Sequence, residues 1–302
     1  MTKSTKWFLA ILALLAIVVV GFSILLMALV ADLPSRTEVV TYGSGEKIAV
    51  IEVIGIIYDS EEVVRQIKDR RSDESIRAIL LRIDSPGGGV VASQEIYEEV
   101  RKTRDEGKPV VVSMGSLAAS GGYYIACGAT RLVANRGTLT GSIGVIGEFL
   151  QLRDALNKLG IDVRTIKSGR LKDAGSAVRD MTREDEQYFQ QIMDDVHRQF
   201  IDVVERERDF THEKILEVSD GRVFTGEQAV EIGLVDTLGT FEDAVTIAAG
   251  LVGIEGEPAL VRERRRHGWL ERAFGEAVET VAGLKRELMD RPILSFRFVG
   301  PS

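Results

Sequence analysis

Apolar runs of strand length alternate with helical patterns through the first half of the chain that follows residue 47. The runs Ala78-Ile79-Leu80-Leu81 and Val110-Val111-Val112 contain no polar residue. Strands that are apolar on both faces are typical of a parallel sheet covered by helices on both sides. The pattern therefore predicts an α/β fold of repeated β-α-β units. The expected strands are 48–57, 76–83 and 109–114, and the expected helices are 61–70, 90–104 and 118–126.

The second half of this region carries weaker strand signals and one strong helical signal. Short strands are expected at 131–134, 143–146 and 163–166. Apolar residues then recur at spacings of three or four, which predicts a long helix over 182–208. The residues that carry this spacing are Tyr188, Ile192, Val196, Phe200 and Val203.

A long apolar stretch stands near the N-terminus. Residues 7–31 contain no Asp, Glu, Lys, Arg or His. About 20 apolar residues in a helix cross the hydrocarbon layer of a membrane, so this stretch predicts a transmembrane anchor. A cleaved secretory signal is the alternative, but the run is longer than the usual apolar region of about 7 to 15 residues. Lys3 and Lys6 precede the span and Asp32 follows it, which predicts a cytoplasmic N-terminus and places the domain after the span on the extracytoplasmic side of the cell membrane.

Composition shifts divide the rest of the chain. Residues 1–31 form the predicted N-terminus and anchor, 32–46 are expected to be a juxtamembrane linker, and the folded domain is expected over 47–256. Residues 257–302 read as a basic, amphipathic and helical C-terminal tail. This tail either rests on a membrane or partner, or is an ordinary terminal helix packed on its own domain.

Charge and cysteine content exclude several classes of protein. Lys and Arg number 38 against 46 Asp and Glu, a net charge of −8, which disfavours a general nucleic-acid binder. Cys127 is the only cysteine, so an internal disulfide is impossible, and with three histidines the common cysteine-rich zinc sites are excluded. No metal and no organic cofactor is expected.

Two glycine-rich segments follow predicted strands, Asp84 to Gly89 and Gly115 to Gly122. Ligands of open α/β sheets bind at the carboxyl ends of strands, where glycines let backbone amides come close. The segments do not fit the phosphate-binding patterns of nucleotide sites. Their amides could instead form an oxyanion hole, which stabilises negative charge on an attacked carbonyl oxygen.

Ser120 is the candidate nucleophile, at the expected start of a helix and before two glycines. An ordinary helix N-cap is the alternative role. The three histidines, His197, His212 and His267, are expected on the surface and are poor candidates for a base. A lysine can serve instead where burial in a dry site disfavours the ammonium form. Lys172 is the candidate, and Lys167 competes with it.

Four segments together resemble the signal peptide peptidase A family in its short form, a family of membrane-anchored serine-lysine proteases in the ClpP/crotonase superfamily. The resemblance runs from about residue 47 to 249. The segments are Asp84-Ser85-Pro86-Gly87-Gly88, Ala119-Ser120-Gly121-Gly122-Tyr123-Tyr124, Ser168 to Asp173, and Gly221 to Ala229 leading to Gly233-Leu234-Val235-Asp236.

This resemblance implies a ClpP/crotonase-like fold and assigns roles to residues. Ser120 would be the nucleophile and Lys172 the general base, with Ser142 holding the lysine amine; a plain turn residue is the alternative for Ser142. Gly87 and Gly88 would supply oxyanion amides, and Gly121 joins them in the expected oxyanion and substrate-binding set.

The implied function is a membrane-bound serine endopeptidase that degrades hydrophobic peptides such as cleaved signal peptides. Short members of the family form a ring-shaped homo-oligomer in which neighbouring subunits share each Ser-Lys pair. Three alternatives stay open: a related membrane protease for one dedicated membrane protein, a crotonase-type acyl-CoA enzyme, and a non-catalytic scaffold.

Overall fold

The computed structural model describes Trp7, Leu15, 36–266 and 294–299, and it divides into two compact units. The first comprises 1–40 and 263–291, and the second comprises 41–262 and 292–302. Within the described residues no helix has the length and apolar character needed to cross a membrane. The predicted anchor over 7–31 lies outside the described residues except for Trp7 and Leu15, which are helical and exposed.

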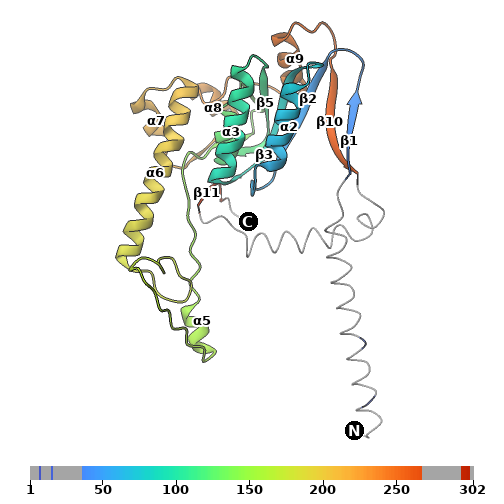
Figure 1. Ribbon diagram of the computed structural model, residues 1–302. Helices are drawn as coiled ribbons and strands as arrows, with labels where there is room; N and C mark the ends of the chain where they lie inside the picture. The colour runs from blue at the N-terminus through green and yellow to red at the C-terminus, as the bar shows by residue number, and fades with distance from the viewer. Residues whose placement is uncertain (1–6, 8–14, 16–35, 267–293, 300–302) are drawn as a thin grey trace. The chain divides into compact units, whose positions relative to one another are not determined.

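The second unit is built on a mixed sheet whose central strands run parallel, in the order β10-β2-β3-β5-β6-β9 (Figure 1). Beside this path β7 pairs parallel with β5 and antiparallel with β8, while β4 and β11 form a separate antiparallel pair. The α/β fold with a large parallel sheet is confirmed. The strands are β1 (Arg36–Tyr42), which crosses the boundary between the units, β2 (Lys47–Ile54), β3 (Ile76–Ser85), β4 (Gly87–Gly89), β5 (Val110–Ala119), β6 (Arg131–Ala134), β7 (Leu139–Gly141), β8 (Val223–Thr225), β9 (Thr237–Leu238), β10 (Ala259–Arg266) and β11 (Ser295–Arg297).

Helices cover both faces of this sheet, as the apolar strands require. Threonine caps begin three of them: Thr182, Thr225 and Thr240 each accept a hydrogen bond from the backbone N–H three residues on, in a reciprocal capping box. The helices are α2 (Glu61–Ser72), α3 (Val90–Asp105), α4 (Gly121–Ala126), α5 (Arg153–Lys158), α6 (Arg183–Arg208), α7 (His212–Val218), α8 (Gly226–Ile232) and α9 (Phe241–Leu251).

Alternate residues of each central strand pack into two different hydrophobic cores, because successive strand side chains point to opposite faces of the sheet. In β3, Ile79, Leu81 and Ile83 join the core under α2, α3, α4 and α6. Ala78 and Leu80 join a second core closed by α9 on the opposite face (Figure 1). All five are fully buried, which explains the continuous apolar run in the sequence.

Two predicted strands are wrong. Residues 163–166 have no sheet partner, and Ile166 is fully exposed, because no neighbouring strand is present to accept the backbone hydrogen bonds. Residues 143–146 contribute only an isolated bridge from Ile146 to Ser295, and the strand of this region comes earlier, as β7. By contrast, the expected strand 131–134 and the long helix starting beside Thr182 are confirmed.

Two pieces of the segment 257–302 belong to the folded unit. Strand β10 pairs in parallel with β2, so Ala259 lies beside Lys47 and Val261 beside Ala49. Its basic residues are accommodated at the sheet, since Arg262 pairs with Glu52 and lies over the ring of Phe241. Strand β11 pairs with the glycines of β4. The predicted amphipathic helix of this segment, around 269–284, lies outside the described residues.

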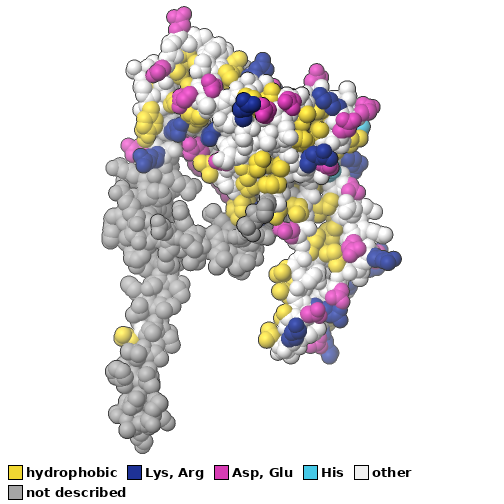
Figure 2. Space-filling model, turned by 180° about the vertical axis from the view of Figure 1, so that it is seen from behind, with side chains coloured by type: hydrophobic (Ala, Val, Ile, Leu, Met, Phe, Trp, Pro, Cys, Tyr) yellow, Lys and Arg dark blue, Asp and Glu magenta, His cyan; other side chains and the backbone are white. Residues whose placement is uncertain are grey.

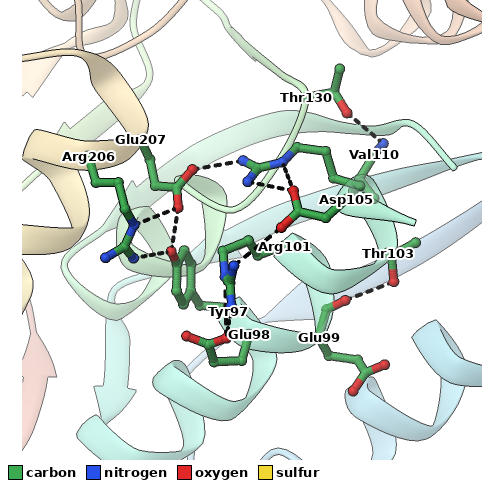
Figure 3. A network of polar contacts seen from close by, with 11 residues as sticks. Tyr97, Glu98, Glu99, Arg101, Thr103, Asp105, Val110, Thr130, Arg206 and Glu207 are labelled. Atoms are coloured by element: carbon green, nitrogen blue, oxygen red, sulfur yellow. Dashed lines mark hydrogen bonds and ion pairs between the residues drawn. The ribbon is translucent and has the colours of Figure 1, made fainter. Parts of the chain in front are cut away.

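A polar network joins α3 to the end of α6 (Figure 3). The side chain of Glu207 is 7% exposed and accepts hydrogen bonds from the Tyr97 hydroxyl at 2.6 Å and from Arg104 at 2.8 Å. Arg206 donates to the same tyrosine hydroxyl at 2.6 Å. Burial by itself would raise the pKa of Glu207, but these hydrogen bonds outweigh it and hold the pKa below its usual value.

We expect Glu207→Ala to lower the free energy of unfolding by about 2 kcal/mol, because it leaves the buried Tyr97 hydroxyl without its acceptor and removes one of the two carboxylates that pair with Arg104. Since the folded-state pKa is depressed, the stabilisation is present above the unfolded-state pKa and is lost as pH falls through the folded-state value. Denaturant unfolding at neutral and acid pH measures both effects. Glu217→Ala, an exposed change on α7, is the control, and an equal loss in the two variants would contradict the role of the network.

Candidate active site

Ser120 stands at the junction of β5 and α4 with an unusual backbone. Its φ is 54° and its ψ is −115°, in a region that favours glycine. For a residue with a side chain this conformation costs about 1–3 kcal/mol, so the surrounding structure must hold it. Its N–H donates to the carbonyl of Gly141 at 2.8 Å, and its carbonyl accepts from Tyr124 at 2.8 Å. A sharp, strained turn between strand and helix is how other hydrolases present a nucleophilic serine.

The Ser120 side chain does not act as a helix cap. It makes no capping hydrogen bond, although the residue occupies the N-cap position of α4. The residue is 1% exposed, and its Oγ has no hydrogen-bond partner among the residues that the structure describes. A buried hydroxyl without a partner is costly and calls for an explanation. This geometry favours the nucleophile over the N-cap role.

The three glycines expected to bind an oxyanion converge beside Ser120. A Cβ on Gly87 would lie 2.5 Å from the amide nitrogen of Gly121, and a Cβ on Gly121 would lie 3.1 Å from the amide nitrogen of Gly88. Gly87 also has a φ of +93°, which residues with side chains rarely adopt. Only residues without side chains allow β4 and the start of α4 to approach each other this closely.

Ser120 and Ser142 each follow directly after the end of a paired strand, β5 and β7 respectively. Ala119 pairs with Gly141 in the β5-β7 ladder, and Ser142 is the next residue along. It is 6% exposed, has a left-handed φ of 50°, and its N–H donates to the carbonyl of Arg222 at 2.8 Å. Ser142 lines a cavity of about 430 Å³.

His197 lines the same cavity and is half-buried, where a solvated surface residue was expected. Its Nε2 is buried and has no hydrogen-bond partner among the described residues. His212 is exposed as expected and contacts Glu205 at 3.2 Å, while His267 lies outside the described residues.

The structure does not bring Lys172 to Ser120. Lys172 is exposed in the connection between α5 and α6, and no hydrogen bond of the described residues joins it to the serine. Its competitor Lys167 is already engaged, since its Nζ donates to Asp173 at 2.5 Å and to the carbonyl of Arg170 at 2.8 Å. Hydrogen bonds from Arg179 and Lys167 lower the pKa of Asp173 to about 2. Of the two lysines, Lys172 is the one available to a partner.

Cys127 at the end of α4 is not a competing nucleophile. Its thiol is buried, and burial raises its pKa to about 12, so the reactive thiolate is suppressed at neutral pH. In the described part of the chain no three His, Cys, Asp or Glu side chains gather as a metal site would require.

The sequence pattern alone did not predict that a C-terminal strand, β11, lies beside the glycines of β4. Strand β11 pairs antiparallel with β4, so that Phe296 lies opposite Gly88. Phe296 is fully buried and packs on Tyr124 and Phe200, with ring centroids 5.1 and 4.8 Å apart. The alternation in Leu294-Ser295-Phe296-Arg297-Phe298 is a strand signal, but a run this short at the end of the chain is ambiguous.

Comparison with known proteins matches this arrangement to a protease family. Residues 102–255 match the model of peptidase family S49, and residues 49–146 match that of Clp protease. The chain belongs to peptidase family S49. It is therefore a serine protease, and the acyl-CoA enzyme and scaffold alternatives are set aside.

Relatives with protease names cover most of the described domain. A Synechocystis sp. protein named as a protease is 45% identical over 211 residues, which span 70% of this chain and 76% of the relative. A protein of Enterococcus faecium named as signal peptide peptidase SppA is 32% identical over 270 residues, spanning 85% of this chain and 78% of the relative. Protease 4 of Salmonella typhi is 41% identical over 221 residues, but this chain spans only 36% of its length.

Proposed function

We propose that this S49 peptidase hydrolyses peptide bonds with a Ser-Lys dyad in which Ser120 is the nucleophile and Lys172 the general base. The observation that carries the proposal is the strained, buried Ser120, whose Oγ has no partner among the described residues and which adjoins the converging glycines. The engagement of Lys167 with Asp173 supports Lys172 over its neighbour.

The acylation step uses these residues in a fixed order. The neutral amine of Lys172 takes the Ser120 hydroxyl proton as Oγ bonds to the carbonyl carbon of the peptide. The N–H of Gly87, expected as an oxyanion donor with that of Gly88, already donates to the Ser85 hydroxyl at 3.0 Å, so the N–H groups of Gly88 and Gly121 would donate to the resulting oxyanion. When the carbonyl re-forms, the carbon–nitrogen bond breaks, and the lysine returns the proton to the departing amine. Water then attacks the acyl-serine with the help of the same lysine and releases the acid product.

Ser142 is the proposed helper hydroxyl. Ser142 and Ser120 directly follow the last pair of the β5-β7 ladder, Ala119 with Gly141, and this position supports a role in holding the lysine amine toward the serine. Both serines have a positive φ, 54° at Ser120 and 50° at Ser142, which residues with side chains rarely adopt.

Hydrophobic peptides, such as the remnants of cleaved signal peptides, are the proposed substrates. The name of the Enterococcus faecium relative supports this class. A related protease that serves one membrane protein is the alternative. The uncharged run over 7–31 supports a single membrane anchor, with the N-terminus in the cytoplasm and the protease domain outside.

A ring-shaped homo-oligomer is the proposed assembly, with Lys172 reaching the Ser120 of a neighbouring copy. The segment before Lys172 exposes apolar side chains among its charges, and Figure 2 shows such side chains on the surface of the molecule. Apolar side chains that remain in water do not stabilise a single chain, so this group of residues supports a contact with another copy. The exposed residues are Leu150, Leu152, Leu159, Ile161, Val163 and Ile166.

We expect Ser120→Ala and Lys172→Ala each to lower kcat by about 1,000-fold or more, because nucleophile and base act as one unit. Lys167→Ala is the matched control on the same loop and should stay within about tenfold of the unchanged protein. Hydrolysis of a fluorogenic peptide measures all three. Retention of more than about a tenth of the activity by Lys172→Ala would refute the dyad.

Mixing the two inactive variants tests whether the dyad is shared between subunits. In a hybrid ring, some sites combine the intact Lys172 of one copy with the intact Ser120 of its neighbour, so activity should return. Native mass spectrometry confirms that subunits have exchanged. Exchanged rings without activity would show that each dyad is completed within a single chain.

Protease accessibility tests the location. Proteinase added to right-side-out spheroplasts should digest the domain that follows residue 31, while a cytoplasmic marker enzyme stays intact. Complete protection of the domain would reverse the orientation. A mature chain that begins near Asp32, found by intact mass, would favour a cleaved signal over the anchor.

A further inference from the structure

The connection that carries Lys172 has no hydrophobic core of its own. None of the residues 151–180 is buried, whereas α6, which follows them, places Val196, Phe200 and Val203 in the main core. In Figure 1 this connection lies at the end of α6 that is remote from the sheet. A segment with few buried apolar contacts opens locally at little cost in free energy. Polar contacts are therefore expected to fix the position of Lys172.

The backbone around Lys172 is folded into consecutive turns. The N–H of Lys172 donates to the carbonyl of Gly169 at 3.1 Å, and the N–H of Ser176 donates to the carbonyl of Asp173 at 3.1 Å. Asp173 directly follows Lys172 in the chain. A contact that holds the Asp173 side chain therefore also holds the peptide bond that joins it to Lys172.

Arg179 joins this loop to α6. Its guanidinium donates to the Asp173 carboxylate at 2.9 Å and to the Asp185 carboxylate at 2.5 Å. Asp185 lies in the first turn of α6, where its side chain is 3% exposed and closes the capping box with Thr182. Hydrogen bonds from Arg179 and from the N–H of Thr182 hold the pKa of Asp185 well below its usual value, so this carboxylate stays charged. The forked guanidinium can hold two carboxylates at once, which suits arginine better than lysine.

Lys167 contacts the same carboxylate but does not make this link. Its hydrogen bonds go to Asp173 and to the carbonyl of Arg170, and both acceptors belong to the loop itself. Arg170 does pair with Glu184 of α6, but these side chains are 74% and 43% exposed, and exposed pairs contribute little. Arg179 is therefore the residue that ties Asp173 to a buried carboxylate of α6.

Because Lys172 is the base of the proposed dyad, we propose that Arg179 and Asp173 are positioning residues that hold Lys172 at a fixed place relative to α6. Arg179 acts through Asp173, and Asp173 acts through its peptide bond to Lys172. Neither side chain exchanges a proton with the substrate. Their effect is on the rate, because a misplacement of about 1 Å in a reacting group can cost about 100-fold.

The first test is the kinetics of the full-length variants on a fluorogenic peptide. Arg179→Ala should lower kcat about 100-fold and leave KM nearly unchanged, because the base is displaced while the peptide still binds. Arg179→Lys should lose less, since it keeps the charge but not the fork. Arg198→Ala is the control, because it removes an exposed arginine that pairs with Asp195 on α6, and it should change neither constant. Each kcat is taken at high pH, where Lys172 is neutral, so that a change in the pKa of the base does not contribute.

Chemical rescue separates positioning from a general loss of structure. Guanidinium chloride at millimolar concentration should raise kcat of Arg179→Ala about tenfold, since the free ion can re-form the forked hydrogen bonds. Sodium chloride at the same concentration is the salt control and should not raise it. Guanidinium should leave Lys172→Ala inactive, because that variant lacks the base itself.

A second variant tests the same link from the loop side. Asp173→Asn keeps the shape of the side chain and leaves α6 intact, and it should lower kcat about tenfold by weakening the hydrogen bond from Arg179. Circular dichroism melting shows whether each variant folds, and Asp173→Asn carries the test if Arg179→Ala does not. An unchanged kcat in either folded variant, or a loss in Arg179→Ala that guanidinium does not restore, would overturn the positioning role. An active Lys172→Ala protein would instead refute the proposed base.

Discussion

The close approach of two backbone segments, at Gly87-Gly88 in β4 and at Gly121 in α4, is the constraint on which the site depends. A Cβ on Gly88 would overlap the carbonyl of Ile57, and one on Gly87 would overlap that of Phe296. Strand β4 is therefore enclosed on both edges by chain that is remote in sequence. Without side chains, the N–H groups of these segments can come close to one another. An oxyanion hole requires such closely spaced N–H groups, because they donate hydrogen bonds to the same oxygen atom.

The parallel sheet supplies the positions of these glycines. Ser85 at the end of β3 pairs with Ala118 near the end of β5. The glycines that follow β3 and the residues that follow β5 therefore lie at the same edge of the sheet. The Ser85 hydroxyl bonds to the carbonyl of Gly55 at 2.6 Å and accepts from the N–H of Gly87 at 3.0 Å. Fully buried apolar residues on both faces hold the strands rigid. The strain at Ser120 is thus borne by packing elsewhere in the domain.

Local pattern was enough to predict the central strands and the start of a helix near Ser120, but not the segments that pair with the edges of the sheet. The runs 78–81 and 110–112 are apolar on both faces and could only be buried strands. Strand β10 was missed because its arginines look like a solvated run, whereas Arg262 is neutralised by Glu52 and packs on Phe241. The error at 163–166 has the opposite cause: its apolar residues suggest a strand, yet the described chain offers no partner.

The two residues of the proposed dyad differ in how far their local structure defines them. Ser120 is defined by bonds within a few residues and by one sheet edge, so a short motif is sufficient to find it. A lysine that acts as a base needs a dry environment, and Lys172 is exposed among the residues that the structure describes. The exposed apolar residues ahead of it would supply that environment only when another surface covers them. In the proposed ring, the same contact would complete the base and bury this segment, so the proposed catalysis and the proposed assembly depend on each other.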